Sequence, residues 1–242
     1  MNEISTLKQW IEEASRIVFF GGAGVSTESG IKDFRSVDGL YHMKFKYPPE
    51  TMLSHTFYER HTEEFYDFYR NQLMPPEEIA PNRAHLRLAE LEQEGKLLAI
   101  VTQNVDGLHE KAGSKRIYNL HGSIYQNRCT ACGKRFDGME GARVIRNARG
   151  VPRCSCGGII KPDVVLYEEG LDDATVSGAL QAIEQADLLI IGGTSLTVYP
   201  AAGLIRYYGG KRLVLINRDE TPYDTQADLI IREPIGQVFA QV

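Results

Sequence analysis

The stretch RIVFFGGAG, residues 16–24, joins a continuous apolar run to a glycine-rich turn. An apolar run without polar alternation is typical of a parallel strand that is covered on both faces. Helical spacing occurs at 7–14, 84–94 and 176–185. The alternation predicts a doubly wound, mostly parallel, Rossmann-like α/β sheet. Further runs of the same kind are 97–101 before Thr102-Gln103-Asn104, 187–191 before Gly192-Gly193-Thr194-Ser195, 212–216 before Asn217, and 228–231.

Two stretches interrupt this alternation. Residues 34–80 are rich in aromatic side chains and are interpreted as a helical insertion. Residues 123–162 contain all four cysteines and few core residues, which is typical of a module held together by a metal. We therefore predict a Rossmann-like domain made of 1–33, 81–122 and 163–242, and a small domain made of 34–80 and 123–162.

Composition and charge limit the classes of partner. The net charge of −5 and the lack of a long Lys or Arg run argue against a nucleic-acid partner. The N-terminal residues do not resemble a signal peptide, and apolar runs such as 188–191 are too short to span a membrane. We expect a cytoplasmic protein, whose thiols stay reduced and are suited to metal binding or catalysis.

The spacing of the cysteines predicts a structural zinc site. Cys129 and Cys132 form one close pair, and Cys154 and Cys156 form another. Two such pairs suit one tetrahedral zinc ion, and four thiolates leave no open position for catalysis. The second pair has one intervening residue where two are common, but the Gly157-Gly158 pair that follows gives the backbone freedom to close the site.

The glycine-rich turn is compatible with phosphate binding. Gly22-Ala-Gly24 follows a strand, and Gly30 comes six residues later, which is not the glycine spacing of dehydrogenases. The alternative is an ordinary tight turn. Nearby, Asp33, Phe34 and Arg35 could form a pocket for a flat ring and an anion. Alternatively, Phe34 belongs to the core and its neighbours form a solvated turn.

The residues after the second predicted strand carry donors and acceptors. Gln103, Asn104 and Asp106 could hold a carboxamide, a ribose or a water molecule. The alternative is a loop that begins the next helix, with Asp106 as its N-cap and His109 on the surface.

One histidine is a candidate general base. His121 follows the short run Ile117-Tyr118 and precedes Gly122. Histidine titrates near a pKa of about 6.5 and can accept a proton at neutral pH, although a lone histidine is usually structural. The other histidines have no special neighbours in the sequence: His42, His55, His61, His85 and His109.

Taken together and in this order, the motifs resemble those of the sirtuin family of NAD-dependent protein deacylases. The resemblance extends from about residue 10 to about residue 240. It rests on residues 22–35, 102–106, His121-Gly122, 162–169, 193–200 and 216–217.

The resemblance implies NAD as cofactor, one structural zinc ion, and acylated lysine-containing proteins or peptides as partners. It implies catalytic roles for His121, Asn104 and Asp106. It implies peptide contacts at Val164, Val165 and Tyr167. The implied NAD contacts are Ala23, Gly24, Thr27, Asp33, Phe34, Arg35, Gln103, Asn104, Val105, Asp106, His121, Gly193, Thr194, Ser195, Asn217 and Ile235.

The implied reaction removes the acyl group from lysine. Nicotinamide leaves the ribose, and the acyl oxygen attacks the anomeric carbon. His121 then takes a proton from a ribose hydroxyl, which attacks the acyl-derived carbon. Water completes the release of lysine and O-acyl-ADP-ribose, and the zinc takes no part in the chemistry.

The chain departs from the family pattern at three places. Lys32 replaces the usual Pro, Glu168 replaces the usual Gly, and the Cys154–Cys156 pair is short by one residue. Relatives that prefer succinyl or malonyl groups use a Tyr-x-x-Arg motif in the helical insertion. Tyr69 takes the place of that arginine here, with Arg70 next to it, which predicts a preference for acetyl or other uncharged acyl groups.

Three other functions fit part of the pattern. An NAD-dependent ADP-ribosyl transferase would cleave NAD in the same way but use another acceptor. A non-catalytic NAD-binding or zinc-ribbon interaction protein would not need the His121, Asn104 and Asp106 set. An NAD-dependent dehydrogenase is disfavoured by the glycine spacing.

Overall fold

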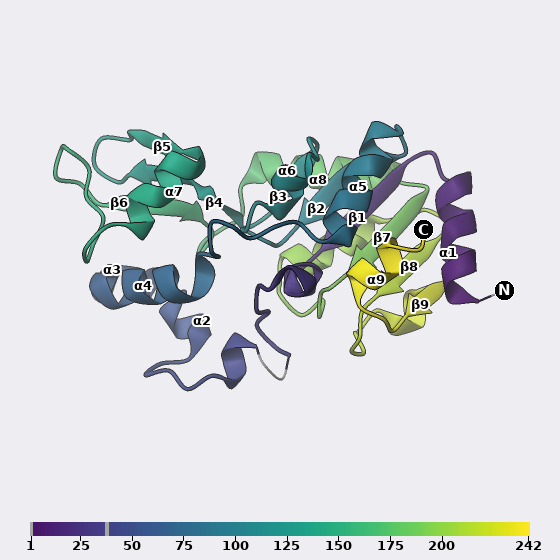
Figure 1. Ribbon diagram of the computed structural model, residues 1–242, viewed down its shortest axis with the longest axis horizontal. Helices are drawn as coiled ribbons and strands as arrows, with labels where there is room; N and C mark the ends of the chain where they lie inside the picture. The colour runs from purple at the N-terminus through teal and green to yellow at the C-terminus, as the bar shows by residue number, and fades with distance from the viewer. Residues whose placement is uncertain (1, 37–38) are drawn as a thin grey trace.

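A six-stranded parallel sheet forms the larger part of the molecule (Figure 1). The computed structural model describes residues 2–36 and 39–242. The strand order corresponds to the doubly wound order of dinucleotide-binding folds, which confirms the predicted fold class. From edge to edge the strands are β3 (Ile117–Asn119), β2 (Leu97–Thr102), β1 (Ile17–Gly21), β7 (Leu188–Gly192), β8 (Leu213–Ile216) and β9 (Leu229–Ile231).

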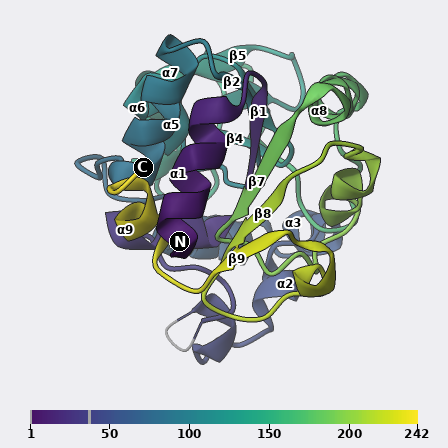
Figure 2. The same cartoon turned by 90° about the vertical axis from the view of Figure 1, so that its right-hand side faces the viewer.

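Helices cover both faces of this sheet (Figure 2). Alternate side chains of β1 point to opposite faces: Phe19 joins one hydrophobic cluster and Phe20 joins the other. Because both faces are covered, every residue of β1 and β7 is buried. On the Phe19 side lie α1 (Glu3–Glu13), α5 (Arg83–Gln93) and α9 (Ile235–Phe239), and on the Phe20 side lie α8 (Asp173–Gln185) and the 3₁₀ turns of 201–207.

The predicted strands and helices differ from the observed ones mainly at their ends. Helix α1 begins four residues before the predicted 7–14, because the Asn2 side chain accepts a hydrogen bond from the backbone N–H of Ser5. Helix α8 begins three residues early, because Asp172 caps it in the same way through Thr175. Polar caps lie outside the apolar pattern on which the prediction rested.

A second, three-stranded antiparallel sheet lies at the other end of the molecule (Figure 1). Its hydrophobic cluster takes few residues from 123–162, as expected, and Ile124, Ile145 and Ile160 are among them. These residues come from separate short elements and form no visible run. The elements are β5 (Arg135–Asp137), β4 (Gly122–Cys129), β6 (Ile160–Val164), α7 (Gly138–Arg146), α2 (Pro49–Met52), α3 (His55–Arg60), α4 (Thr62–Phe68) and the π-helical turn 69–73.

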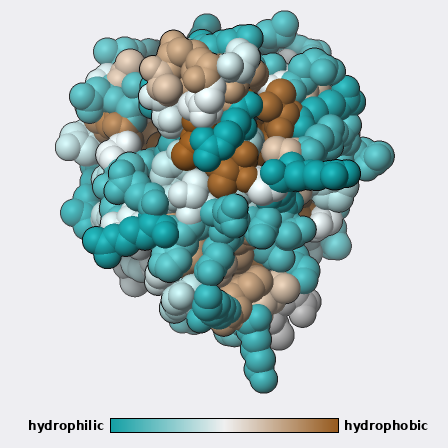
Figure 3. All heavy atoms as spheres, turned by 90° about the vertical axis from the view of Figure 1, so that its left-hand side faces the viewer, coloured by the Kyte–Doolittle hydropathy of each residue, from teal (hydrophilic) through white to brown (hydrophobic). Residues whose placement is uncertain are grey.

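The division into a large and a small domain stays a prediction, which this cluster supports. It joins residues of the predicted insertion, such as Phe65 and Tyr66, to residues of the cysteine-bearing stretch. Strand β6 extends across the predicted boundary at 163. On the surface of this end, small hydrophobic areas lie between hydrophilic side chains (Figure 3). Helix α7 leaves Met139 and Val144 partly exposed.

Among the described residues, none of the helices combines the length and the apolar character that crossing a membrane would require.

Candidate active site

Three loops meet at the carboxyl edge of the large sheet. Gly21, at the end of β1, is in register with Thr102 of β2 and with Gly192 of β7. The loops that follow these strands therefore start side by side, at the point where the strand order reverses. The backbone N–H of Gly24 donates to the carbonyl of Gly193 (2.8 Å). A Cβ atom on Gly24 would lie 2.8 Å from the Gly193 Cα, so only glycine fits there.

A cavity of about 560 Å³ opens at this edge. Its size is in the range of small-molecule sites. All the residues predicted to contact cofactor or peptide lie along its wall. They are Ala23, Gly24, Thr27, Asp33, Phe34, Arg35, Gln103, Asn104, Val105, Asp106, His121, Val164, Val165, Tyr167, Gly193, Thr194, Ser195, Asn217 and Ile235.

His121 lies between β3 and β4 on the cavity wall. Its Nδ1 is 3.0 Å from the backbone carbonyl oxygen of Gln103. Because a carbonyl oxygen only accepts, Nδ1 carries the proton and Nε2 has the free lone pair. Burial lowers the pKa of His121, and the Gln103 carbonyl opposes that shift. The imidazole is therefore neutral at neutral pH and able to accept a proton.

The backbone at position 122, directly after this histidine, requires a glycine. Its φ is 76°, in the left-handed region that glycine adopts readily. A Cβ atom there would collide with the backbone carbonyl of Asp163 on the neighbouring strand.

Asn104 and Asp106 are held by a buried serine. The Ser26 hydroxyl donates to Asp106 Oδ2 (2.7 Å) and accepts from Asn104 Nδ2 (3.1 Å). The backbone N–H of Leu108 donates to Asp106 Oδ1 (2.9 Å). Burial raises the pKa of Asp106, while the hydrogen bonds from Ser26 and Leu108 act against this shift. Both side chains are thus fixed before any ligand binds. Asp106 also accepts the first N–H of the following helix, as the alternative expected, although Gly107 holds the N-cap position itself.

The far end of the cavity joins the loops after β7 and β8. Gln103 Nε2 donates to the Thr194 hydroxyl (3.1 Å), which links the loops after β2 and β7. The Asn217 amide donates to the carbonyl of Asp219 (2.9 Å) and shapes the loop after β8. Ile235 is buried at the start of α9.

The loop 31–36 borders the cavity near the three-loop junction. Asp33 Oδ1 accepts hydrogen bonds from the backbone N–H groups of Arg35 and Ser36. Phe34 packs edge-on against Tyr41 and against the hydrophobic cluster of the small sheet, so it is both a packing residue and part of the cavity wall. Lys32, on the same wall, is exposed.

The segment 164–169 forms another side of the cavity. The backbone N–H of Val165 donates to the carbonyl of His121 (2.9 Å). Further along, the N–H of Tyr167 donates to the carbonyl of Leu53 (3.0 Å), and Ser54 pairs with Tyr167 in a parallel bridge. This extended segment therefore connects the histidine to the start of α3.

The sequence model of the Sir2 family matches residues 22–200, most of the chain. The chain belongs to this family.

Relatives throughout the family support this assignment. The NAD-dependent protein deacetylase of Clostridium acetobutylicum is 58% identical over 245 residues, which cover 100% of this chain and 98% of that protein. A solved Sir2 complex with p53 peptide and NAD+ has a TM-score of 0.86 and 35% identity, covering 100% of this chain and 97% of that one. A Sir2 complex with deacetylated p53 peptide and 3'-O-acetyl ADP ribose has a TM-score of 0.89 and the same identity and coverage.

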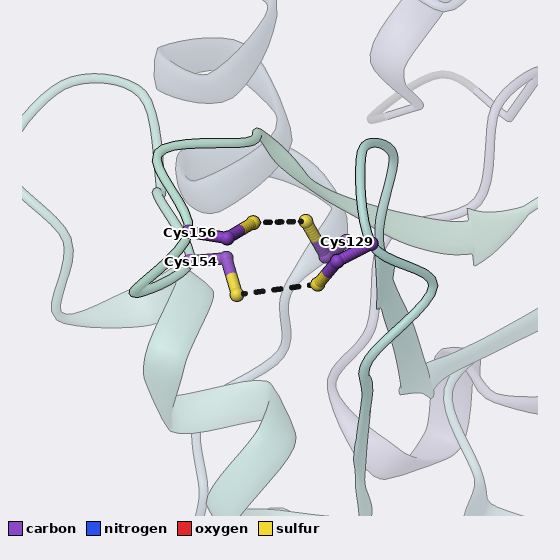
Figure 4. Close-up of side chains that lie close together, drawn as sticks. Cys129, Cys154 and Cys156 are labelled. Carbon is purple, nitrogen blue, oxygen red and sulfur yellow. Dashed lines mark hydrogen bonds between the residues drawn. The ribbon is translucent and has the colours of Figure 1, made fainter.

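The four cysteines of this Sir2 chain come together at the end of the small sheet (Figure 4). Cys129 Sγ and Cys156 Sγ are 3.4 Å apart, and Cys132 Sγ and Cys154 Sγ are 3.8 Å apart. All four sulfur atoms lie within 4.8 Å of one another. Zinc–sulfur bonds of about 2.3 Å in a tetrahedron require sulfur separations of about 3.8 Å. The cluster fits one zinc ion, and the short Cys154–Cys156 pair does not prevent closure.

One expectation about the other histidines was wrong, and two of them have neighbours in space that the sequence did not show. His109 is buried rather than on the surface, and it packs against the ring of the buried His85. His85 Nε2 lies 3.5 Å from the Ser26 hydroxyl, and His55 contacts Glu169, so both have special neighbours. These partners are far apart in the sequence, which is why spacing did not reveal them.

Ser26 is the site residue that motif analysis passed over. It lies within the quoted stretch 22–35, but a serine in a glycine-rich loop looks like turn chemistry. Its burial, with 1% of the residue's surface exposed, distinguishes it from a turn serine.

Proposed function

We propose that this chain is an NAD-dependent protein-lysine deacetylase that transfers the acyl group to ADP-ribose and releases nicotinamide and deacylated lysine. The observation that carries the proposal is the neutral His121, with Nε2 free, on the wall shared by the three-loop junction and the extended segment 164–169. The names of the relatives and the peptide and NAD+ complexes of the solved Sir2 structures support the same function.

The cavity residues fit NAD in both size and chemistry. The close backbone approach of Gly24 and Gly193 leaves room for the phosphates, with Ala23 and Thr27 beside them. We assign the adenosine half to the end formed by Gly193, Thr194, Ser195, Asn217 and Ile235, and the nicotinamide half to the end formed by Gln103, Asn104, Val105 and Asp106, under the loop of Asp33, Phe34 and Arg35.

Bound NAD supplies an anomeric carbon that becomes electrophilic as nicotinamide leaves. His121 then accepts a proton from a ribose hydroxyl at Nε2, while its Nδ1–H stays fixed on the Gln103 carbonyl. Asn104 and Asp106, held by Ser26, present an amide and a carboxylate without having to reorganise. Val164, Val165 and Tyr167 offer backbone edges along which an extended peptide can pair.

Changing His121 tests this assignment most directly. His121→Tyr is expected to abolish release of nicotinamide and O-acetyl-ADP-ribose from NAD and an acetyl-lysine peptide, because the proton acceptor is lost. Circular dichroism and zinc content should match the wild type. Near-normal turnover in this variant would falsify the role of His121.

We propose that Cys129, Cys132, Cys154 and Cys156 hold one structural zinc ion. Four thiolates fill a tetrahedral site and leave no place for substrate, so the ion would hold the small sheet together. Metal analysis of the purified protein should give about one zinc per chain. A folded protein without metal would contradict this.

We expect the enzyme to prefer peptides that carry uncharged acyl groups. Tyr69 is buried, and its neighbour Arg70 is bound to Asp67 and to the carbonyl of Gly150. Neither lines the cavity, so no cation of this helix faces the substrate. An acetylated peptide should turn over faster than the same peptide succinylated, and a faster succinyl reaction would overturn the preference.

An ADP-ribosyl transferase remains the alternative with the same first step. Labelled NAD distinguishes the two: a deacetylase yields O-acetyl-ADP-ribose in solution, whereas a transferase leaves label on protein. We also propose a cytoplasmic location, since a reducing compartment keeps four neighbouring thiols free to bind a metal. Cell fractionation tests it.

A further inference from the structure

The residue that replaces the family glycine has an unusual backbone conformation. Glu168 has a φ of 75°, in the left-handed region. A residue with a Cβ atom is strained there, whereas glycine adopts this conformation readily. Among the described residues, Leu196 is the only other non-glycine residue with a positive φ. Glu168 persists in this conformation only if its surroundings hold it.

The side chain of Glu168 provides that support. Its Oε2 accepts a hydrogen bond from the backbone N–H of Thr56 (2.9 Å), near the start of α3. The first N–H groups of a helix have no partner within the helix. At α3 the N–H of His55 donates to the carbonyl of Tyr167 (3.0 Å), and the N–H of Phe57 donates to the Ser54 hydroxyl (3.1 Å). Glu168 binds the remaining N–H between them.

This bond adds to the anchoring of the segment that borders the cavity. The segment is fixed at one end by the Val165–His121 hydrogen bond. At its other end, Glu169 accepts from the backbone N–H of Leu166 (2.9 Å) and pairs with His55 (2.8 Å). Loss of the Glu168 carboxylate would free the turn at 168 and leave the strain in its backbone.

We propose that Glu168 is a positioning residue for peptide binding, which caps α3 and thereby fixes the segment 164–168 against the substrate. This inference rests on the proposed deacetylase function. The glutamate offers an acceptor that glycine would lack, and it does so at the cost of backbone strain.

Steady-state kinetics of three variants test the proposal. Glu168→Ala keeps the strain and loses the cap. It should raise the KM for an acetyl-lysine peptide about fivefold to tenfold, the factor that loss of a helix cap gives, with kcat and the KM for NAD changed less than about twofold. Glu168→Gln keeps an oxygen acceptor and should restore a peptide KM within about threefold of the wild type. Glu168→Gly should raise the peptide KM as alanine does but unfold at higher urea concentration than the alanine variant.

A matched control separates capping from charge. Glu50 lines the hollow beside Glu168 and is exposed. Glu50→Ala removes a carboxylate from the same hollow and should leave the peptide KM unchanged. The proposal is overturned if Glu50→Ala raises that KM as much as Glu168→Ala does, if Glu168→Gln is as impaired as Glu168→Ala, or if Glu168→Ala keeps the wild-type KM.

Hydrogen exchange at the Thr56 amide separates this proposal from the proposed function. Exchange should be faster in Glu168→Ala than in the wild type and should stay slow in Glu168→Gln. Unchanged exchange in the alanine variant overturns the cap. A wild-type protein that releases no nicotinamide with an acetylated peptide overturns the deacetylase function, whatever the exchange shows.

Discussion

The two sheets of this molecule are stabilised in different ways. The central strands of the large sheet are buried along their whole length between two hydrophobic clusters. The small sheet has one cluster, and strand β5 exposes both of its end residues. Its far end carries the four-cysteine cluster instead. We therefore expect the large apolar core to be stable by itself, and the small sheet to depend on the proposed zinc ion.

Loss of zinc should have the largest effect, and only on the small sheet. Cys132→Ser removes an exposed ligand without changing the packed core. Zinc contributes about 10–16 kcal/mol to the folding of small zinc peptides. Hydrogen exchange of residues 122–164 should become fast, while the strands of the large sheet stay protected. Ser155→Ala, which lies between two ligands, is the control and should keep both zinc and protection. If residues 122–164 exchanged equally slowly in Cys132→Ser and in the wild type, the small sheet would not depend on zinc.

A cavity made in the core of the large sheet should instead destabilise that sheet and leave the zinc site intact. Phe19 is fully buried and packs edge-on against Phe239. Phe19→Ala should lower the free energy of unfolding by about 3–5 kcal/mol, because it removes a ring from a dense core. Urea unfolding measures this, and zinc content should not change. Leu86→Ala on exposed α5 surface is the control, with an expected change within about 0.5 kcal/mol. Zinc loss in Phe19→Ala would show that the two sheets fold as one unit.

The same contrast explains what the sequence could reveal. The strands of the large sheet were predictable, because burial on both faces leaves a continuous apolar run such as 188–191. The strands of the small sheet were not, because β4 reads GSIYQNRC, with neither a continuous apolar run nor a regular alternation, and β5 is only three residues long. The cysteine cluster was predictable from spacing alone, since thiolates need no apolar pattern.

Some residues of the candidate site could likewise be predicted from the sequence, and others could not. Residues directly after strands, such as Gln103 and Asn104, could be placed from the order of the runs. His121 acquired its proposed role through the resemblance, because one histidine after a short run is a weak pattern. The contacts of Ser26 with His85 and with Asp106 could not be predicted, since they join residues 59 or more positions apart.

Loss of the hydrogen bonds around Ser26 should have a moderate effect on activity. Ser26→Ala leaves Asn104 and Asp106 without their shared partner in a buried place. Unpairing buried polar groups costs about 1–3 kcal/mol, so kcat/KM for NAD should fall roughly tenfold to a hundredfold. Ser29→Ala, in the same loop, removes a buried hydroxyl that has no hydrogen-bond partner among the described residues, and it should have little effect. Equal losses in the two variants would contradict the network.

The smallest expected effect is a shift in the pH at which activity falls on the acid side. Burial lowers the pKa of His121 below its ordinary value of 6.5, so the base remains neutral until the pH falls below that value. The acid limb of kcat/KM should therefore have its midpoint below pH 6.5, since this profile reports groups of the free enzyme. His61, in the hollow beside α3, lies outside the cavity wall, and His61→Gln should keep the same limb. A limb above 6.5 would mean that an anion stabilises the imidazolium, and the Gln103 carbonyl alone could not then explain the state of the base.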